Sequence, residues 1–164
     1  MKIRITKHFD FETAHALYGY DGKCKNIHGH SYQLYVTVIG IPISDANHAK
    51  NGMVLDFGDL KKIVKSEIVD IFDHATVLNQ NSPHKELAEK IKPHSPKVIL
   101  VDYQPTSENM LVDFAEKIRV RLPNPVTLHS LKLYETNNSY AEWFASDQAS
   151  PSVLSQGEGA NSRH

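Results

Sequence analysis

The chain has 164 residues, of which 40% are hydrophobic and 23% are charged. This length suits a single compact domain that buries a substantial core. Eighteen lysine and arginine residues stand against nineteen aspartate and glutamate residues, which gives a formal net charge of −1. The chain therefore lacks the basic excess that a general nucleic-acid-binding protein needs.

The longest apolar stretch, residues 34–43, is too short to cross a bilayer. The N-terminal segment alternates between polar and apolar residues, which is not the pattern of a signal peptide. Cys24 is the only cysteine, so no intrachain disulfide can form. From these features we expect a soluble, cytoplasmic protein with no nucleic-acid or membrane partner.

The first two expected elements are β-strands. Between residues 2 and 11 the apolar side chains fall on odd positions and the polar ones on even positions, and this period of two predicts a half-buried strand. Residues 12–30 contain three glycines and many polar side chains, so we expect a loop there. β-branched and aromatic residues dominate again at 31–40, which predicts a second strand.

Two helices are expected in the middle of the chain. Apolar side chains recur at helical spacing from Leu60 to Ile71, and again from Thr106, a natural N-cap, to Leu122. The intervening residues 72–105 are mixed, with a short helix expected at 84–91 and an apolar run at 98–101.

Two more strands are expected at 126–135 and 140–145, which completes the order strand–strand–helix–helix–strand–strand. This order predicts an α+β fold in which a four-stranded antiparallel sheet carries two helices on one face. We expect residues 1–146 to form one domain. Residues 147–164 are small and polar, and we expect this tail to be disordered.

The histidines of this chain suggest a metal site. The segment CKNIHGH contains His28 and His30, and His15 lies upstream in FETAH. Side chains two residues apart in an extended segment point to the same side, so these two histidines can bind one ion and His15 can supply a third ligand. Three neutral nitrogens with an open position describe a catalytic zinc site. The alternative is a set of solvated loop histidines.

Cys24, four residues before His28, has three interpretations. It can be a fourth ligand, which would close the site and make it structural. It can be a free thiol that a nearby cation or base activates for proton transfer or attack. It can also be an inert buried thiol, although its polar, lysine-flanked surroundings argue against burial.

Three carboxylates are further candidates. Asp73 precedes His74, and a carboxylate can orient an imidazole and raise its basicity, although neighbouring side chains seldom face each other. Glu108 lies in the first turn of the second helix, where the helix dipole alone explains it. Glu135 lies late in an apolar strand, where it can face solvent or accept two hydrogen bonds from the guanidine-like edge of a pterin or guanine ring.

Taken together, these segments resemble the 6-pyruvoyl-tetrahydropterin synthase and 6-carboxy-tetrahydropterin synthase family. The matching strings run in the family's order from about residue 9 to residue 144: FETAH, CKNIHGHSY, GMVLDFGDLK, FDHATVLN, PTSENM and YETNNSYAEW. The resemblance implies a tunnelling fold, whose four-stranded sheets assemble into an oligomeric barrel. It also implies a homo-oligomer, a hexamer of two stacked trimers, with sites shared between subunits.

The resemblance also implies a role for each candidate residue. A zinc ion, Zn2+, would be held by His15, His28 and His30. A catalytic triad that moves protons would consist of Cys24, Asp73 and His74. The pterin ring of the substrate would be anchored by Glu135 and bound with the help of Thr106 and Glu108.

The spacing of the cysteine separates two branches of the family. Three residues lie between Cys24 and His28, as in the bacterial queuosine-pathway enzyme and unlike the longer spacer of animal-type pyruvoyl synthases. The resemblance therefore implies a lyase that converts 7,8-dihydroneopterin triphosphate into 6-carboxy-5,6,7,8-tetrahydropterin, acetaldehyde and triphosphate. Two alternatives stay open, a 6-pyruvoyl-tetrahydropterin synthase and a non-catalytic pterin-binding zinc protein. Folate-bypass relatives carry a glutamate at the position of Cys24, which argues against that branch.

Overall fold

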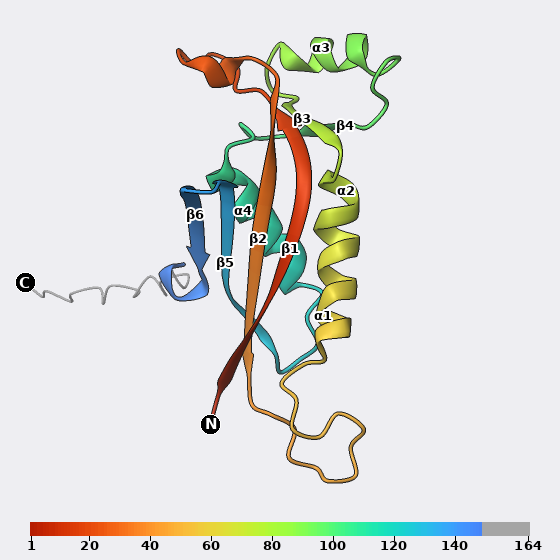
Figure 1. The fold of residues 1–164 in the computed structure, drawn as a ribbon, viewed down its shortest axis with the longest axis vertical. Coiled ribbons are helices and arrows are strands. Elements are labelled where there is room, and N and C mark those ends of the chain that lie inside the picture. Colours follow the sequence, from red (N-terminus) through yellow and green to blue (C-terminus); the bar gives the residue numbers. More distant parts are fainter. Residues whose placement is uncertain (149–164) are drawn as a thin grey trace, which may run out of the picture.

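The computed structural model describes residues 1–148, arranged around one twisted sheet (Figure 1). The strand order across the sheet is β4-β3-β1-β2-β5-β6. The strands span β1 Ile3–His15, β2 His28–Gly40, β3 Ala75–Asn79, β4 Val98–Val101, β5 Thr127–Thr136 and β6 Ser139–Phe144. The fold is thus α+β, as the sequence predicts. Apart from its first two residues, the tail expected at 147–164 lies outside the described residues.

The sheet has six strands where the sequence predicts four. The antiparallel strands β1, β2, β5 and β6 are the expected ones, and β3 and β4 extend the sheet beyond β1. This extension is parallel, since β3 pairs with Thr13–His15 of β1 and β4 pairs with β3. Such short strands with distant parallel partners leave no alternating pattern in the sequence.

The first two strands are longer than expected. β1 continues to His15 and β2 begins at His28, so the loop spans residues 16–27 rather than 12–30. The antiparallel register places His15 opposite His28 and Thr13 opposite His30. Two of the three glycines of this region, Gly19 and Gly22, lie in the loop, and Gly29 lies in the paired start of β2.

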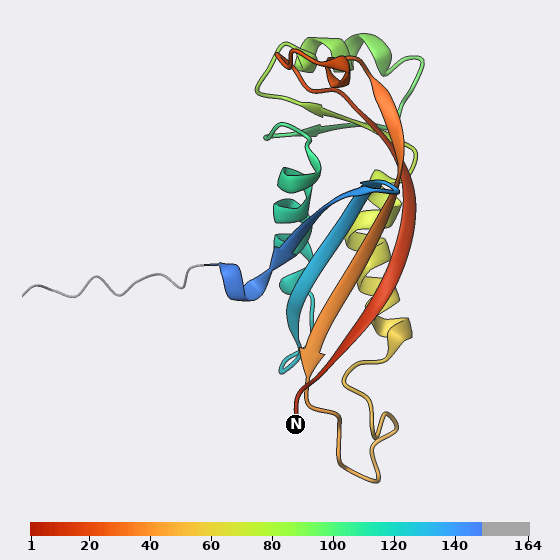
Figure 2. The same cartoon turned by 60° about the vertical axis from the view of Figure 1, so that its left-hand side comes forward.

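The main helices cover one face of the sheet (Figure 2). The first consists of α1 Phe57–Val64, a π-helical turn Lys65–Val69 and α2 Asp70–Phe72, and it matches the expected helix from Leu60 to Ile71. The second, α4 Ser107–Arg119, begins after Thr106, whose side chain accepts a hydrogen bond from the Asn109 backbone. None of the helices within residues 1–148 is long and apolar enough to cross a membrane.

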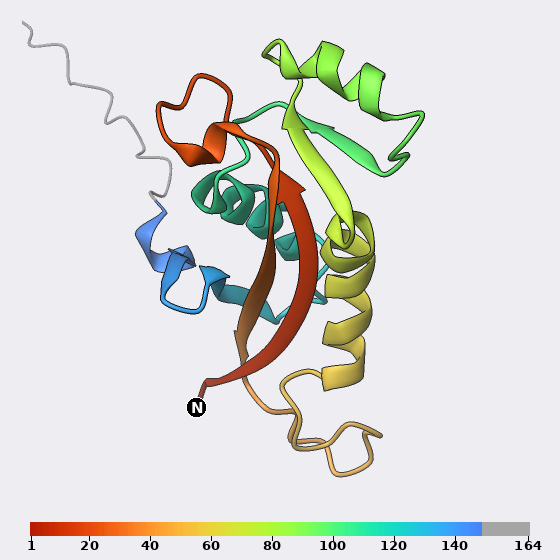
Figure 3. The same cartoon turned by 45° about the horizontal axis from the view of Figure 1, so that its top comes forward.

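Most of the hydrophobic core lies between the sheet and these helices. At its centre the fully buried ring of Phe114 contacts Phe11 of β1 and Phe72 of α2 edge to face, with ring centroids 6.1 and 4.9 Å apart. A second, smaller cluster forms at one end of the molecule, where α3 His84–Ile91 packs beside β3 and β4 (Figure 3). Residue Ala16, at the start of the loop 16–27, is buried in this second cluster.

Candidate functional site

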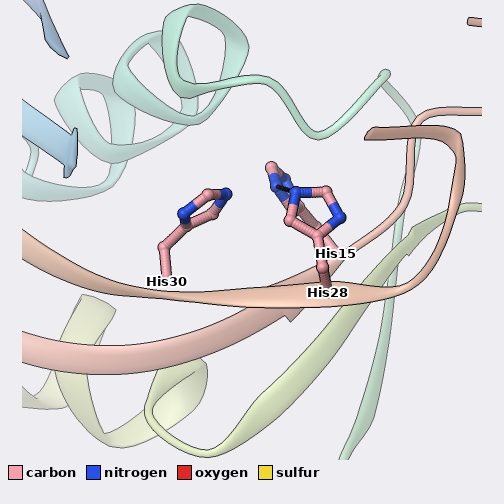
Figure 4. Close-up of side chains that lie close together, drawn as sticks. All are labelled: His15, His28 and His30. Carbon is pink, nitrogen blue, oxygen red and sulfur yellow. Dashed lines mark hydrogen bonds between the residues drawn. The ribbon is translucent and has the colours of Figure 1, made fainter. Parts of the chain in front are cut away.

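Three strands carry polar residues near one end, at positions where their alternating pattern otherwise places apolar side chains in the core. They are His15 on β1, His28 and His30 on β2, and Glu135 on β5. Each follows the same alternation that buries the apolar side chains of its strand, so all four lie on the helix-covered side of the sheet. Figure 4 shows the three imidazole rings gathered above the paired strand ends.

The three histidines form one compact cluster. One ring nitrogen from each lies within 4.8 Å of the others, which is a spacing that can hold a metal ion. The Nε2 atoms of His15 and His28 are 3.1 Å apart, and the ring of His30 lies 5.1 and 4.9 Å from the other two rings. The proximity expected from the HGH spacing and the upstream His15 is therefore confirmed.

Backbone carbonyls fix the protonation of two of these rings. The Nδ1 of His15 lies 2.7 Å from the carbonyl oxygen of Pro105, and the Nδ1 of His28 lies 2.7 Å from that of Asn26. Because a carbonyl oxygen only accepts, both Nδ1 atoms carry the proton and both Nε2 atoms present lone pairs to each other. A cation between the rings satisfies this acceptor–acceptor contact.

The ring of His30 also has a nitrogen that is free to bind a cation. The Nε2 of His30 is buried and forms no hydrogen bond with any residue in the described chain. Burial lowers the pKa of His15 and of His30, in the latter against the opposing influence of the Glu135 carboxylate. Both imidazoles therefore favour the neutral form that can donate a lone pair to a metal. The donor set fits a divalent metal such as zinc.

Tyr32 lies beneath the cluster and was not predicted. Its ring is fully buried, and its hydroxyl lies 3.4 Å from the Nδ1 of His15. Burial raises the pKa of the Tyr32 hydroxyl, which therefore stays protonated. Tyr32 reads as an ordinary core position of an alternating strand, so the sequence offers no signal for this contact.

Glu135 lies beside the cluster, between His30 and Ser107. Its Oε1 is 3.4 Å from the Nε2 of His30, and its Oε2 accepts a hydrogen bond of 2.8 Å from the hydroxyl of Ser107. Ser107 opens α4 directly after the N-cap Thr106, and sequence reasoning missed it because a serine at that place needs no explanation. The interpretation of Glu135 as a solvent-facing strand residue is wrong, since its side chain is only 28% exposed and points to the site.

A small hollow of about 140 Å³ adjoins this carboxylate. Its lining residues come from α4, β5 and β6: Ser107, Glu108, Glu135, Ser139, Tyr140 and Ala141. The exposed Glu108 and the partly buried Glu135 thus line the same hollow. Thr106 is engaged as the N-cap of α4, where its hydroxyl accepts from Asn109 at 3.3 Å.

Asp73 and His74 do face each other although they are adjacent in the chain. The Nδ1 of His74 lies 3.0 Å from the Oδ1 of Asp73, because His74 turns the chain with a left-handed φ of 58° where α2 ends. Asp73 is anchored in turn, since its Oδ1 accepts from the Glu12 backbone at 2.9 Å. This backbone donor, and next the contact with His74, lower the pKa of Asp73. The His74 side chain is 77% exposed.

Cys24 is bonded neither to the histidine cluster nor to the Asp73–His74 pair within the described residues. It sits half-buried in the loop 16–27, where its carbonyl accepts from the Leu17 backbone at 2.9 Å. Its sulfur is not part of the three-histidine cluster, and no hydrogen bond among residues 1–148 joins it to Asp73 or His74. The interpretation of Cys24 as a fourth metal ligand therefore finds no support, and the thiol is free.

Comparison with known proteins identifies the family to which this chain belongs. The profile of the family described as 6-pyruvoyl tetrahydropterin synthase matches residues 4–146. A 6-carboxy-5,6,7,8-tetrahydropterin synthase from Haemophilus influenzae is 36% identical over 142 residues, covering 86% of this chain and 98% of the relative. The enzyme of that name from Aquifex aeolicus is 32% identical, covering 87% and 98%. A 6-pyruvoyl tetrahydrobiopterin synthase from Pongo abelii is 30% identical, covering 84% and 88%.

Solved structures share the fold. An uncharacterized protein from Wolinella succinogenes aligns with a TM-score of 0.73 at 22% identity, covering 88% of this chain and 99% of that one. The 6-pyruvoyl tetrahydropterin synthase of Caenorhabditis elegans aligns with a TM-score of 0.62 at 26% identity, covering 88% and 96%. A profile match that spans 4–146 and relatives matched over almost their whole length lead to one conclusion: this chain belongs to the 6-pyruvoyl tetrahydropterin synthase family.

Proposed function

We propose that this protein is a zinc-dependent 6-carboxy-5,6,7,8-tetrahydropterin synthase of queuosine biosynthesis. It would convert 7,8-dihydroneopterin triphosphate into 6-carboxy-5,6,7,8-tetrahydropterin, acetaldehyde and triphosphate. The observation that carries the proposal is the cluster of His15, His28 and His30 beside Glu135. The bacterial relatives that bear this enzyme name, and the three-residue spacer after Cys24, favour it over the pyruvoyl branch.

The metal would be held by the three histidine Nε2 atoms, with Pro105 and Asn26 orienting two of the rings through their carbonyls. A bound zinc ion would supply Lewis acidity to the hydroxyl and carbonyl oxygens of the substrate side chain. The buried Tyr32 hydroxyl stays neutral beneath the rings, because burial raises its pKa. The ligands of the ion would therefore be the three neutral imidazoles alone.

Glu135 would anchor the pterin ring. An ionised carboxylate accepts two parallel hydrogen bonds from a guanidine-like edge, and Ser107 fixes the orientation of this carboxylate by donating to Oε2. The hollow beside it, which Glu108 also lines, would receive the ring. The distance of 3.4 Å between Glu135 and His30 keeps a ring anchored there within reach of the metal centre.

Asp73, His74 and Cys24 would transfer the protons. The Asp73 carboxylate, fixed by the Glu12 backbone, orients the His74 imidazole. The free Cys24 thiol would be the partner in this exchange. Because no hydrogen bond within residues 1–148 links the two parts, we propose that Cys24 works with the Asp73–His74 pair of a neighbouring copy.

Open strand edges on β1 and β6 support a closed homo-oligomer. Among residues 1–148, β1 has a neighbour on its β3 side only at Thr13–His15, and β6 has a neighbour only on its β5 side. Exposed edges invite pairing, and a barrel closed by several copies removes them. The exposed His74 lies directly beyond the open part of β1, where its backbone donates to the Glu12 carbonyl at 2.6 Å. We propose the hexamer of stacked trimers as this assembly.

The test is product analysis by mass spectrometry after zinc-loaded protein has been incubated with 7,8-dihydroneopterin triphosphate. Formation of 6-carboxy-5,6,7,8-tetrahydropterin together with acetaldehyde is the expected result. Formation of 6-pyruvoyl-tetrahydropterin would assign the protein to the sister reaction. If the substrate is bound but unchanged, the protein is a non-catalytic pterin-binding protein and the proposal is wrong.

A further inference from the structure

The strand–helix–strand unit β3–α3–β4, residues 75–101, lies outside the four-stranded antiparallel part of the sheet. It sits at the same end of the molecule as the loop 16–27, and the two are side by side in Figures 1 and 3. None of the residues of this unit belongs to the histidine cluster, to the lining of the Glu135 hollow or to the Asp73–His74 pair. Its contacts reach both segments that carry the proposed triad.

The loop that carries Cys24 is attached to this unit at two places. Residue Ala16, fully buried, packs with Leu78 of β3 and Ala88 of α3. Two residues further on, the ring of Tyr18 meets the ring of His84 edge to face, with centroids 5.3 Å apart and planes at 79°. Edge-to-face pairs of this kind hold a defined geometry.

A third contact comes from the chain that leaves β4. The Gln104 side chain donates a hydrogen bond of 2.9 Å to the Tyr18 carbonyl. The Leu17 backbone donates to the Cys24 carbonyl at 2.9 Å, which ties the far side of the loop to the anchored side. The position of Cys24 therefore depends on the packing of Tyr18 against His84 and Gln104.

The other half of the triad is held by Lys97, the residue directly before β4. Its ammonium group donates to the carbonyls of Asp70 and Asp73, at 2.9 and 2.5 Å. These carbonyls belong to the last turn and the C-cap of the continuous helix that α1, the π-helical turn and α2 form, where a cation both supplies hydrogen bonds and complements the helix dipole. His74 follows in a left-handed conformation, which is strained for a residue with a side chain and persists only when its surroundings hold it.

We propose that the β3–α3–β4 unit positions both halves of the triad, with Lys97 fixing the Asp73–His74 turn and His84 fixing the Cys24 loop through Tyr18. This inference rests on the proposed function for its kinetic consequences. Its structural content, that two segments are held in place by one unit, is independent of the reaction.

The first test replaces Lys97 with Met, which keeps most of the length of the side chain and removes the donors. We expect kcat to fall by about tenfold or more, because misplacing a catalytic group by about 1 Å is this costly. KM and metal content should stay unchanged, and Lys97→Arg should restore most of kcat. The matched control is Lys92→Met, since Lys92 lies in the same unit and its side chain pairs with the exposed Glu89.

The second test replaces His84 with Ala, with His84→Phe as the conservative variant that keeps an aromatic ring against Tyr18. We expect the alanine variant to lose kcat and the phenylalanine variant to retain it. His94→Ala is the control, because His94 is an exposed histidine of the turn after α3. If the alanine variant keeps its kcat, or if KM and kcat change in equal measure, the positioning role of His84 is wrong.

Amide hydrogen exchange tests the positioning role of Lys97 without a measurement of enzyme activity. The Asp73 and His74 amides donate to the carbonyls of Val69 and Glu12, so both are protected. Lys97→Met should speed their exchange about fivefold, as expected for loss of charge-assisted hydrogen bonds at an exposed position, while amides of α4 stay unchanged. Unchanged exchange at Asp73 and His74 overturns the role of Lys97. A wild-type protein that forms no product overturns the proposed function instead.

Discussion

His15 and His28 face each other through Nε2 atoms that lie 3.1 Å apart, while the Nδ1 of each ring is bound to a backbone carbonyl. The strand register that pairs the two residues brings them this close. Two lone pairs at this distance repel each other, and a shared cation relieves the repulsion. We therefore expect the chain to be more stable with a metal ion than without one.

The first prediction is that His28→Ala abolishes stoichiometric metal binding. Two remaining imidazoles make an incomplete site, and ligands of a metal centre contribute to affinity jointly. Metal analysis of purified protein should show about one ion per chain for the wild type and far less for the variant. Chelation should lower the melting temperature of the wild type but not of the variant. A variant that keeps the full metal content would place the site elsewhere.

The second prediction concerns Glu135. Replacing it with Gln keeps an acceptor for Ser107 but removes the charge that would bind the pterin edge. We expect pterin affinity to fall by about tenfold to a hundredfold, as expected for loss of a charge-assisted pair of hydrogen bonds. Binding can be followed by the fluorescence of an oxidised pterin, with metal analysis in parallel. Loss of the metal together with the pterin would show that Glu135 supports the cluster rather than the ligand.

The third prediction tests whether neighbouring copies share a site. Cys24→Ala and His74→Ala should each be inactive alone. After the two proteins are unfolded and refolded together, half of the chains supply Cys24 and half of their neighbours supply His74, so about a quarter of wild-type activity should return. Native mass spectrometry verifies that mixed oligomers form. If mixed oligomers stay inactive, each site uses Cys24 and His74 of one chain.

The fourth prediction follows from the lowered pKa of Asp73, which the Glu12 backbone donor and His74 cause. A carboxyl with a lowered folded-state pKa contributes stability above its ordinary value of 3.8, and this contribution is lost as the pH falls through the folded-state pKa. The stability advantage of the wild type over Asp73→Asn should therefore shrink below pH 3.8. Urea unfolding at a series of acidic pH values measures it. Asp21→Asn, at an exposed loop position, is the matched control.

The fifth prediction concerns the core. Phe114 is fully buried between Phe11 and Phe72, so Phe114→Ala leaves a cavity that its neighbours cannot fill. The expected cost is about 3–5 kcal/mol of unfolding free energy. Val112→Ala on the same helix is the control, because its side chain is 54% exposed. Chemical denaturation of both variants checks the difference, which a loss of less than about 1 kcal/mol would contradict.

The regular parts of this fold could be predicted because each leaves a periodic signal. The alternation of β1, β2 and β5 identifies their buried faces, and extending it places His15, His30 and Glu135 on the same side of the sheet. The helical stripes likewise predict α1–α2 and α4. These are local patterns, and they survive in a single sequence.

The remaining features depend on contacts between distant residues. Strands β3 and β4 are only five and four residues long and pair in parallel, so no alternation announces them. The contact between Asp73 and His74 needs a left-handed turn at His74, which nothing in that dipeptide requires. Ser107 acquires its role only because the start of α4 packs against the end of β5.

The second hydrophobic cluster has a consequence for how the molecule responds to heat. Within residues 1–148 its buried members are only Ala16, Leu78 and Ala88, whereas the buried members of the main core unite both long helices with five strands. Small clusters open at a lower free energy than the global unfolding transition. The end of the molecule that carries the Cys24 loop should therefore melt first, and the protein should lose activity while its circular dichroism still reports a folded sheet and helices.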